Sequence, residues 1–411
     1  MSNVPEIRFK GYTDAWVQRK LGTTVDRVCV GFVGTLEKDY TDSSGIPLYR
    51  TGNLSGLTLN NDNLKYVTRE FHEKNQKSQL KHGDILIARH GENGKAIVYT
   101  LNEDANCLNI VIIRPGNSEI NSAFLANYIN SPVINKKIQG LSAGSTQNVI
   151  NTKEIEKLDL LIPKIKSEQD KIAKFIQKLD NTITLHKRKL EGLKVLKQAY
   201  LQRMFPQNGE SVPRLRFVGF VGDWETKMLK EISNKVTEKN SEKEFTETLT
   251  NSAEYGIINQ REFFDKDISN EKNLGGYFVV RPDDFVYNPR ISNHAPVGPI
   301  KRNLLGRTGV MSPLYYVFRV AAGNLTFIEK YFESVYWHEF MKLNGDNGVR
   351  ADRFNIKDSV FEEMPIPFPS LSEQKAIGEL FHNLDNQIIA QQIKLNNLKQ
   401  LKSAYLQKMF V

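Results

Sequence analysis

The 411-residue chain has only two cysteines, Cys29 and Cys107. Two thiols are too few for a disulfide framework or for a zinc site built on cysteines, and they fit a reducing cytoplasm. No apolar run approaches the roughly 18 to 20 residues needed to cross a bilayer, and the N-terminal stretch lacks the basic start and apolar core of a signal peptide. We therefore predict a cytoplasmic protein.

Recognisable catalytic motifs are also missing. There is no Gly-x-Gly-x-x-Gly dinucleotide fingerprint, and the seven histidines show no metal-ligand spacing. Residues 89–96 resemble a phosphate loop but lack its first glycine and its magnesium-binding Ser or Thr. Residues 287–290 (YNPR) resemble the Asn-Pro-Pro-aromatic motif of amino-methyltransferases, but Arg290 replaces the second proline. Asp283 and Asp284 are not followed by the Glu-x-Lys of a nuclease. The sequence therefore offers no candidate catalytic residue and no candidate metal site.

What the chain does contain is a long internal repeat, which sets the expected architecture. Residues 5–21 reappear at 213–229, and residues 168–205 align without gaps on 373–410 with 19 identities in 38 positions. Both copies of the longer repeat open with Ser-Glu-Gln after a proline-containing strand end, pass through Leu-Asp-Asn and end in Ala-Tyr-Leu-Gln-x-Met-Phe. The order is a start segment, a variable block and a helix, followed by the same three parts.

The longer repeat has the apolar spacing of a coiled coil, with steps of four and three residues. At 1.5 Å per residue, 38 residues make a helix of roughly 57 Å. If the two helices pair antiparallel, the polar interruptions His186 and Gln391 face one another; the alternative is two unrelated amphipathic helices, each docked on its own domain. The predicted seam consists of Ile172, Leu179, Ile183, His186, Leu190 and Leu193 in the first copy and Ile377, Leu384, Ile388, Gln391, Leu395 and Leu398 in the second.

The variable blocks mix short β-like runs (85–88, 110–113, 277–280, 315–320) with helical stretches such as 121–138. The predicted class is α+β: two globular α/β-mixed domains separated by two long helices that form an antiparallel coiled coil, with an internal pseudo-two-fold repeat. The predicted boundaries are 1–165 for the first domain, 166–208 for the first spacer helix, 209–365 for the second domain and 366–411 for the second spacer helix.

Polar loops in both blocks have the composition of DNA-reading surfaces. Arg and Lys pair with guanine edges, Asn and Gln pair with adenine, and Ser, Thr and Gly-rich turns bind phosphates. Such loops also occur as plain solvated turns. The candidate DNA-binding residues are Arg50, Thr51, Asn53, Arg89, His90, Asn93, Lys95, Gly144, Ser145, Thr146 and Gln147 in the first block, and Asn288, Arg290, Ser292, Asn293, Lys301, Arg302, Asn347, Arg350 and Arg353 in the second.

Taken together, these features resemble the specificity (S) subunit of type I restriction-modification systems, over nearly the whole chain. The resemblance is carried by the start segments with Trp16 and Trp224, by Gly-Ser-Thr-Gln at 144–147, and by Ile-Pro followed by Ser-Glu-Gln at 162–169 and 366–374. It extends to the two repeated helices. The second block departs from the pattern, because GVRADRF at 348–354 stands where Gly-Ser-Thr-Gln is expected.

The resemblance implies a non-catalytic DNA-recognition subunit with two target recognition domains, each reading one half of a split, asymmetric double-stranded DNA sequence. The helices would form a spacer and bind two modification (methyltransferase) subunits, to which restriction (translocase-nuclease) subunits attach. S-adenosylmethionine, ATP and Mg²⁺ would belong to those partners, with no cofactor in this chain. The alternatives are a free-standing coiled-coil scaffold or binding protein and, further away, an intrinsic DNA methyltransferase.

The net charge of +9, from 56 basic and 47 acidic residues, is concentrated on the first repeated helix. Residues 164–208 hold 11 basic and 4 acidic residues, whereas residues 209–364 hold 21 and 23. A charge run on a helix is often only a solvated face. The sharper hypothesis is that it faces the DNA gap or an acidic modification subunit. The residues concerned are Lys171, Lys174, Lys178, Lys187, Arg188, Lys189 and Lys194.

Overall fold

The computed structural model describes residues 3–54, 58–89, 95–116, 120–143, 151–263, 271–347 and 352–411. The chain divides into two compact units: unit 1 contains Met1–Arg188 and Gln392–Val411, and unit 2 contains Lys189–Gln391. Each unit therefore combines one variable block with part of each long helix. Within the described ranges, no helix has both the length and the apolar character needed to cross a bilayer.

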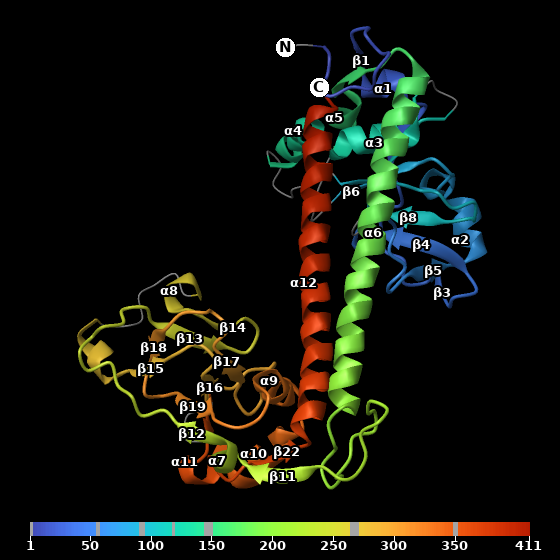
Figure 1. Cartoon of the computed structure of the whole chain (residues 1–411). Coiled ribbons are helices and arrows are strands. Elements are labelled where there is room, and N and C mark those ends of the chain that lie inside the picture. The colour runs from blue at the N-terminus through green and yellow to red at the C-terminus, as the bar shows by residue number, and fades with distance from the viewer. Residues whose placement is uncertain are drawn as a thin grey trace. The chain divides into compact units, whose positions relative to one another are not determined.

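The two repeated segments form the long helices α6 (Lys166–Arg203) and α12 (Leu371–Lys408), which run side by side (Figure 1). In unit 1, the rings of Phe175 and Tyr405 meet at 4.8 Å, and Lys402 Nζ lies 2.6 Å from Asp180 Oδ1. In unit 2, the corresponding pair is Lys197 Nζ and Asp385 Oδ1, also at 2.6 Å. Residue numbers rise along one helix as they fall along the other, which confirms the predicted antiparallel pairing.

The predicted seam residues lie in the interior of this helix pair. Most of them are buried: Ile172, Ile183, Leu190, Ile377, Leu384, Gln391 and Leu395. Leu179, Leu193, Ile388 and Leu398 are half-buried. Since the seam faces away from water, apolar burial rather than helix propensity stabilises these rods. The facing of His186 and Gln391 stays a prediction.

The block of unit 1 is built on a four-stranded antiparallel sheet, in the order β2 (Arg27–Val30), β9 (Ile110–Arg114), β6 (Ile85–Ala88) and β7 (Ala96–Val98). A second sheet has the order β3 (Tyr40–Thr41), β5 (Lys65–Val67), β4 (Ile46–Arg50) and β8 (Asn106–Leu108). Every residue of β6 is buried, because Ile85 and Ile87 face one core cluster while Leu86 and Ala88 face another. A central strand covered on both faces explains its continuous apolar run.

Two helices, α3 (Ser122–Asn130) and α4 (Pro132–Ala143), cover one face of this sheet. The sequence predicted one helical stretch over 121–138, and the single stretch is wrong. Ser131 adopts an extended conformation, with φ −66° and ψ 149°. The ring of Pro132 disfavours the helical conformation in the residue that precedes it, so the chain breaks there into two helices.

The start segment closes the core of unit 1. Its strand β1 (Val17–Lys20) pairs antiparallel with β10 (Asp159–Ile162), and the short helices α1 (Leu21–Thr24) and α5 (Thr152–Glu156) lie beside this pair. Trp16 is 1% exposed and packs edge-on against the rings of Phe124 and Phe410. Residues in the last turn of α12 and just after it, including Leu406 and Phe410, therefore complete the core of unit 1.

Unit 2 repeats this plan with β12 (Ser233–Lys235), β19 (Tyr316–Val320), β16 (Phe285–Tyr287) and β17 (Ile300–Arg302) in one antiparallel sheet. Its start-segment pair is β11 (Glu225–Met228) with β22 (Pro365–Phe368), and its helices are α7 (Leu229–Ile232), α9 (Leu325–Glu333), α10 (Trp337–Asn344) and α11 (Asp358–Phe361). The hairpin β13 (Leu249–Ser252) with β14 (Gly256–Asn259), the pair β15 (Phe278–Val280) with β18 (Gly309–Met311), the pair β20 (Asp346–Asn347) with β21 (Phe354–Asn355), and helix α8 (Gln260–Phe263) complete it.

The Ser-Glu-Gln motif fastens the start of each long helix to its block. In unit 1, Arg8 donates from Nε and Nη2 to the two carboxylate oxygens of Glu168, at 2.6 and 2.8 Å. Gln169 accepts from the backbone N–H of Asn121, the N-cap of α3, at 2.9 Å, and donates to the carbonyl of Pro163 at 3.3 Å. One dipeptide thus joins the start segment, α3 and α6.

The second copy makes the same contacts in unit 2. Arg216 donates to Glu373 at 2.6 and 2.8 Å. Gln374 accepts from the N–H of Asn324, the N-cap of α9, at 2.8 Å and donates to the carbonyl of Pro369 at 2.8 Å. The identities between the two copies therefore mark structural contacts that both units need.

Candidate nucleic-acid interface

The first candidate loop of unit 1, at 50–53, is built around a buried amide. Asn53 is 2% exposed, accepts from the backbone N–H of Arg50 at 2.9 Å and donates to the carbonyl of Asn60 at 2.9 Å. Arg50 is half-buried and donates to the carbonyl of Asn63, while the Thr51 hydroxyl lies 3.4 Å from the carbonyl of Asn109. Asn53 shapes this loop from inside, and its prediction as a DNA contact stays untested.

Lys95 lines a groove of about 770 Å³ inside unit 1, between the block and the long helices. The side of the block contributes Asn127 and Asn130 of α3, and the long helices contribute Asn181 of α6 and Lys402 of α12. Asn130 is pinned to the backbone of Ala96, accepting at 2.8 Å and donating at 2.7 Å. Amides suit adenine edges. Sequence reasoning missed this lining because its members are widely separated in the chain and carry no motif.

Several of the predicted contacts fall outside the residues that the structure describes. In unit 1 these are His90, Asn93 and Gly144, Ser145, Thr146 and Gln147; in unit 2 it is Arg350. Asn347 belongs to β20 and pairs with Phe354 of β21. Arg89, which precedes one of the undescribed stretches, is half-buried.

In unit 2, two candidate segments that are far apart in the sequence come together by backbone pairing. Ile291 donates its N–H to the carbonyl of Asp352 at 3.0 Å, and Phe354 donates to the carbonyl of Pro289 at 2.7 Å. This pairing sets Arg290, which is exposed, opposite Arg353, which is half-buried. The neighbouring Ser292 and Asn293 are exposed in a tight turn. We call Arg290, Ser292, Asn293 and Arg353 together the arginine cluster of unit 2.

Asn288 starts this segment but points inward. It is 6% exposed, donates to the carbonyl of Asn251 at 2.8 Å and accepts from the N–H of Arg290 at 3.0 Å. Like Asn53, it satisfies buried backbone groups and so holds the loop that carries Arg290. Its prediction as a DNA contact stays untested.

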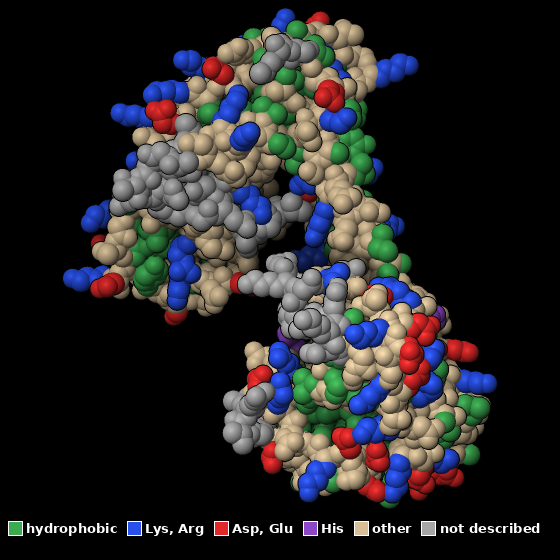
Figure 2. Space-filling view, turned by 90° about the vertical axis from the view of Figure 1, so that its left-hand side faces the viewer, with side chains coloured by type: hydrophobic (Ala, Val, Ile, Leu, Met, Phe, Trp, Pro, Cys, Tyr) green, Lys and Arg blue, Asp and Glu red, His purple; other side chains and the backbone are tan. Residues whose placement is uncertain are grey.

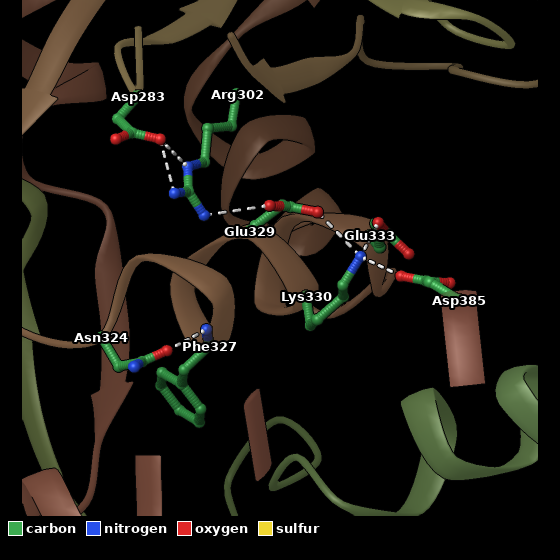
Figure 3. A network of polar contacts seen from close by, with 8 residues as sticks. All are labelled: Asp283, Arg302, Asn324, Phe327, Glu329, Lys330, Glu333 and Asp385. Atoms are coloured by element: carbon green, nitrogen blue, oxygen red, sulfur yellow. Dashed lines mark hydrogen bonds and ion pairs between the residues drawn. The ribbon is translucent and has the colours of Figure 1, made fainter. Parts of the chain in front are cut away.

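Lys301 and Arg302 lie on β17, and Arg302 joins a charged network with α9 (Figure 3). Arg302 donates to Asp283 at 2.5 and 2.9 Å and to Glu329 at 3.3 Å, and its side chain is only 13% exposed. Burial lowers the pKa of Lys301, although the nearby carboxylate of Glu333 opposes this effect. The charge of Arg302 is already balanced by two carboxylates, so it differs from the exposed charge of Arg290.

Lys330 lies at the centre of the same network, where Figure 3 shows its ammonium group between the carboxylates of α9 and α12. Its Nζ lies 2.7 Å from Glu329, 2.6 Å from Glu333 and 2.7 Å from Asp385. Burial alone would lower the pKa of Lys330, but the carboxylates outweigh it and the pKa is raised. Unit 1 has Asn127 at this place in α3, so the network is particular to unit 2.

Basic side chains do not gather into one patch on the face that Figure 2 shows, where Lys and Arg are interspersed with Asp and Glu. The basic residues predicted to matter on α6, from Lys171 to Lys194, are all exposed. Three of them, Lys171, Lys174 and Lys178, line one shallow hollow of unit 1 with Phe9 and Phe175. Electrostatic attraction would therefore act from the exposed basic residues of α6, and on the face shown it would not come from one continuous basic patch.

The family model for the type I restriction modification DNA specificity domain matches residues 34–195 and 222–400. These two segments cover most of the chain. Each contains most of one variable block and most of one long helix. The chain belongs to this family. It is a DNA specificity subunit of a type I restriction-modification system with two target recognition domains, which is a recognition role and not a catalytic one.

Relatives along the full length agree with this assignment. A protein of Methanocaldococcus jannaschii named as a type I restriction enzyme MjaX specificity subunit is 25% identical over 396 residues, covering 90% of this chain and 87% of the relative. The crystal structure of the type I restriction-modification system S subunit from M. genitalium has the same fold, with a TM-score of 0.59, 14% identity and 99% of each chain covered. A structure from work on complex assembly and conformational transition of the type I R-M system has a TM-score of 0.53, 15% identity and coverage of 95% and 96%.

Proposed function

We propose that this specificity subunit reads a split, asymmetric double-stranded DNA target, with one half read by each target recognition domain. The observation that carries the proposal is that one scaffold bears two different sets of side chains. In unit 1, Ile87 pairs with Val111 between the two central strands of the main sheet. At the equivalent place in unit 2, Tyr287 pairs with Tyr316. Two domains with the same backbone plan and different loops and linings are expected to read different bases, because base readout depends on side-chain identity.

The paired helices supply the spacing between the two readers. DNA presents the same face every 10 to 10.5 base pairs, about 34 Å, so a rigid helix pair favours half-sites about one turn apart. The buried seam and the Lys–Asp ion pairs in both units support a fixed register between α6 and α12. The tolerated gap in the DNA target is therefore a property of helix length.

The same helices are the proposed docking surface for two modification (methyltransferase) subunits, one for each half-site. Leu196 and Leu401 occupy equivalent positions of the two copies and are 38% and 43% exposed. Exposed leucines repeated at equivalent positions suit two identical partners. Restriction (translocase-nuclease) subunits would attach to the modification subunits. S-adenosylmethionine, ATP and Mg²⁺ would be bound by these partners.

Methylation profiling of the genome, with and without this gene, tests the proposal. The expected result is the loss of one bipartite adenine-methylation motif when the gene is deleted. Exchanging residues 230–364 for the corresponding block of another family member should change one half of that motif and leave the other half and the gap intact. An unaltered methylome in a strain with working modification subunits would refute the proposal.

A further inference from the structure

Unit 2 contains a cavity of about 440 Å³ where the ends of β16 and β19 meet the 353–358 segment. Aromatic rings dominate its lining, which includes Tyr287, Tyr315, Tyr316, Phe354 and Phe361. Its volume falls within the range of roughly 300 to 1,000 Å³ found for small-ligand sites. Arg353, a predicted DNA contact and a member of the arginine cluster, also lines this cavity. The cavity therefore lies beside the arginine cluster.

The rings on the floor of the cavity are held rigidly. Tyr287 and Phe361 stack with their centroids 5.0 Å apart, and Tyr316 lies 4.8 Å from Phe361. The hydroxyl of Tyr316 donates to Glu362 at 2.8 Å, and the hydroxyl of Tyr287 donates to the carbonyl of Val297 at 3.0 Å. The hydroxyls of Tyr287 and Tyr316 are hydrogen-bonded and the rings are packed, so these side chains are already ordered. Binding of a flat ligand would therefore cost little side-chain conformational entropy.

Unit 1 shows that the scaffold itself does not require these rings. The positions of Tyr287 and Tyr316 correspond to Ile87 and Val111, because the sheet register repeats. Phe361 corresponds to Ile155, because its carbonyl accepts from the N–H of Met364 as the carbonyl of Ile155 accepts from the N–H of Leu158. All three aliphatic side chains are fully buried in the main core cluster of unit 1. The aromatic lining is therefore a local feature of unit 2, added to a fold that is stable with aliphatic residues.

The lining of the cavity contains the cations Lys235 and Arg353, the carboxylate of Asp358, and a donor in need of an acceptor. Arg353 Nε is buried and meets no acceptor within the described part of the chain. A buried donor without a partner is unfavourable, so a bound acceptor would stabilise it. Lys235 also lines the cavity, with its Nζ 2.6 Å from Asp358 Oδ2, and Arg290 lies opposite Arg353 in the backbone pairing.

We propose that this cavity holds one unstacked base of the DNA half-site read by unit 2, with the base stacked on the aromatic lining and Arg353 donating to the base or to its phosphate. Aromatic stacking platforms beside Arg and Lys are the usual chemistry for holding a base outside the helix. The inference rests on the proposed function, since it needs this unit to bind DNA. It adds a reader that recognises a base outside the duplex.

The test measures binding of the subunit, in complex with its modification subunits, to duplexes that carry the methylated motif. Each base pair of the half-site assigned to unit 2 is replaced in turn by a mismatch and by an abasic site. A mismatch weakens pairing, so at the unstacked base it should tighten binding about fivefold to tenfold, whereas at an ordinary contact it should weaken binding. An abasic site at the unstacked position should weaken binding about tenfold, because the stacked ring is lost.

Variants separate this base from the adenine that a modification subunit takes up for methylation. Tyr315→Ala and Arg353→Gln should each abolish the mismatch effect at one position and leave the methylated adenine unaffected. Tyr255→Ala, at an exposed aromatic residue in the turn between β13 and β14, is the matched control and should change neither.

Specific binding in which no position depends on Tyr315 or Arg353 would overturn the base pocket and leave the proposed function standing. Absence of sequence-specific binding by the unaltered complex would overturn both.

Discussion

Replacing Lys330 with Met tests whether the charged network of Figure 3 holds unit 2 together. The side chain of Lys330 is 3% exposed and contacts three carboxylates, two on α9 and that of Asp385 on α12. Lys197 of α6 contacts Glu333 at 2.7 Å and Asp385 at 2.6 Å. Two lysines therefore balance a shared set of carboxylates, and the variant would leave one lysine to do so.

The expected loss follows from burial. Removing one partner of a buried ion pair leaves an uncompensated charge in low dielectric and typically costs about 3–5 kcal/mol. For a unit of this size, 1 kcal/mol shifts the unfolding temperature by about 2–4 °C, so the transition of unit 2 should fall by about 6–20 °C. The methionine side chain matches the length of lysine, so lost packing contributes little.

The loss should also depend on pH. Burial would raise the pKa of Glu333 and Asp385, but Lys330 and Lys197 outweigh it and the pKa of both is lowered. A carboxyl with a lowered pKa contributes stability that is present above its unfolded value of about 4 and disappears as the pH falls through the folded value. Without Lys330 the pKa values of Glu333 and Asp385 rise. As the pH falls, these carboxylates therefore become protonated in the variant before they do in the wild type, and the cost of burying their charge disappears. The difference between wild type and variant should shrink from pH 7 to pH 5.

Calorimetry and urea unfolding of the full chain measure both effects. Asn127→Met is the matched control, because Asn127 occupies the equivalent position of α3 in unit 1, is half-buried and belongs to no charged network; it should change stability by less than about 1 kcal/mol. A loss below about 1 kcal/mol at pH 7 in Lys330→Met, or a loss that is the same at pH 7 and pH 5, would refute the reasoning.

Three further predictions concern the length of the paired helices, the Arg8–Glu168 ion pair and the basic residues of α6. Inserting seven residues into both α6 and α12 preserves the heptad spacing of the seam and adds about 10 Å to each helix. The gap in the methylated motif should then grow by about three base pairs, with both halves unchanged. Methylation mapping that finds the original gap would exclude a spacer role for the helices. Glu168→Gln leaves Arg8, which is 11% exposed, without its charged partner and should cost unit 1 about 3 kcal/mol in urea unfolding. A loss no larger than that of Glu154→Gln, at an exposed ion pair, would show that the Arg8–Glu168 pair does not fasten α6 to its block. Changing Lys171, Lys174 and Lys178 together to Gln should weaken binding to all DNA sequences alike and lower the salt slope by about 3, whereas a selective loss at one half-site would argue against phosphate contacts.

The architecture was accessible from the sequence because it is carried by repetition and by hydrophobic period. The gapless match of 168–205 with 373–410 predicted two long helices of 38 residues, and α6 (Lys166–Arg203) and α12 (Leu371–Lys408) have that length. The break at Ser131 was missed, although the signal of Pro132 was present, because the apolar pattern continues across it. The repeated Ser-Glu-Gln was visible as an identity, but its contacts with Arg8 and Asn121 depend on residues distant in the sequence.

The candidate DNA-binding residues were harder to sort, since composition does not show which way a side chain points. Asn53 and Asn288 have the same residue type as exposed Asn293, yet each satisfies buried backbone groups. Arg302 and Arg290 are both arginines of one loop-rich block, but only Arg302 is enclosed by carboxylates. Burial and partners are set by strands that meet only in the folded chain.

The sequence by itself therefore determined the duplication, the paired helices and the family, because identities and heptad spacing are local patterns that survive without coordinates. Only the tertiary structure decided which polar residues build loops and which remain on the surface, and it alone revealed the amide-lined groove of unit 1 and the aromatic cavity of unit 2. The physical reason is that a pocket is made by side chains from separate strands and helices, such as Tyr287, Tyr316 and Phe361, whose proximity is a consequence of register and packing.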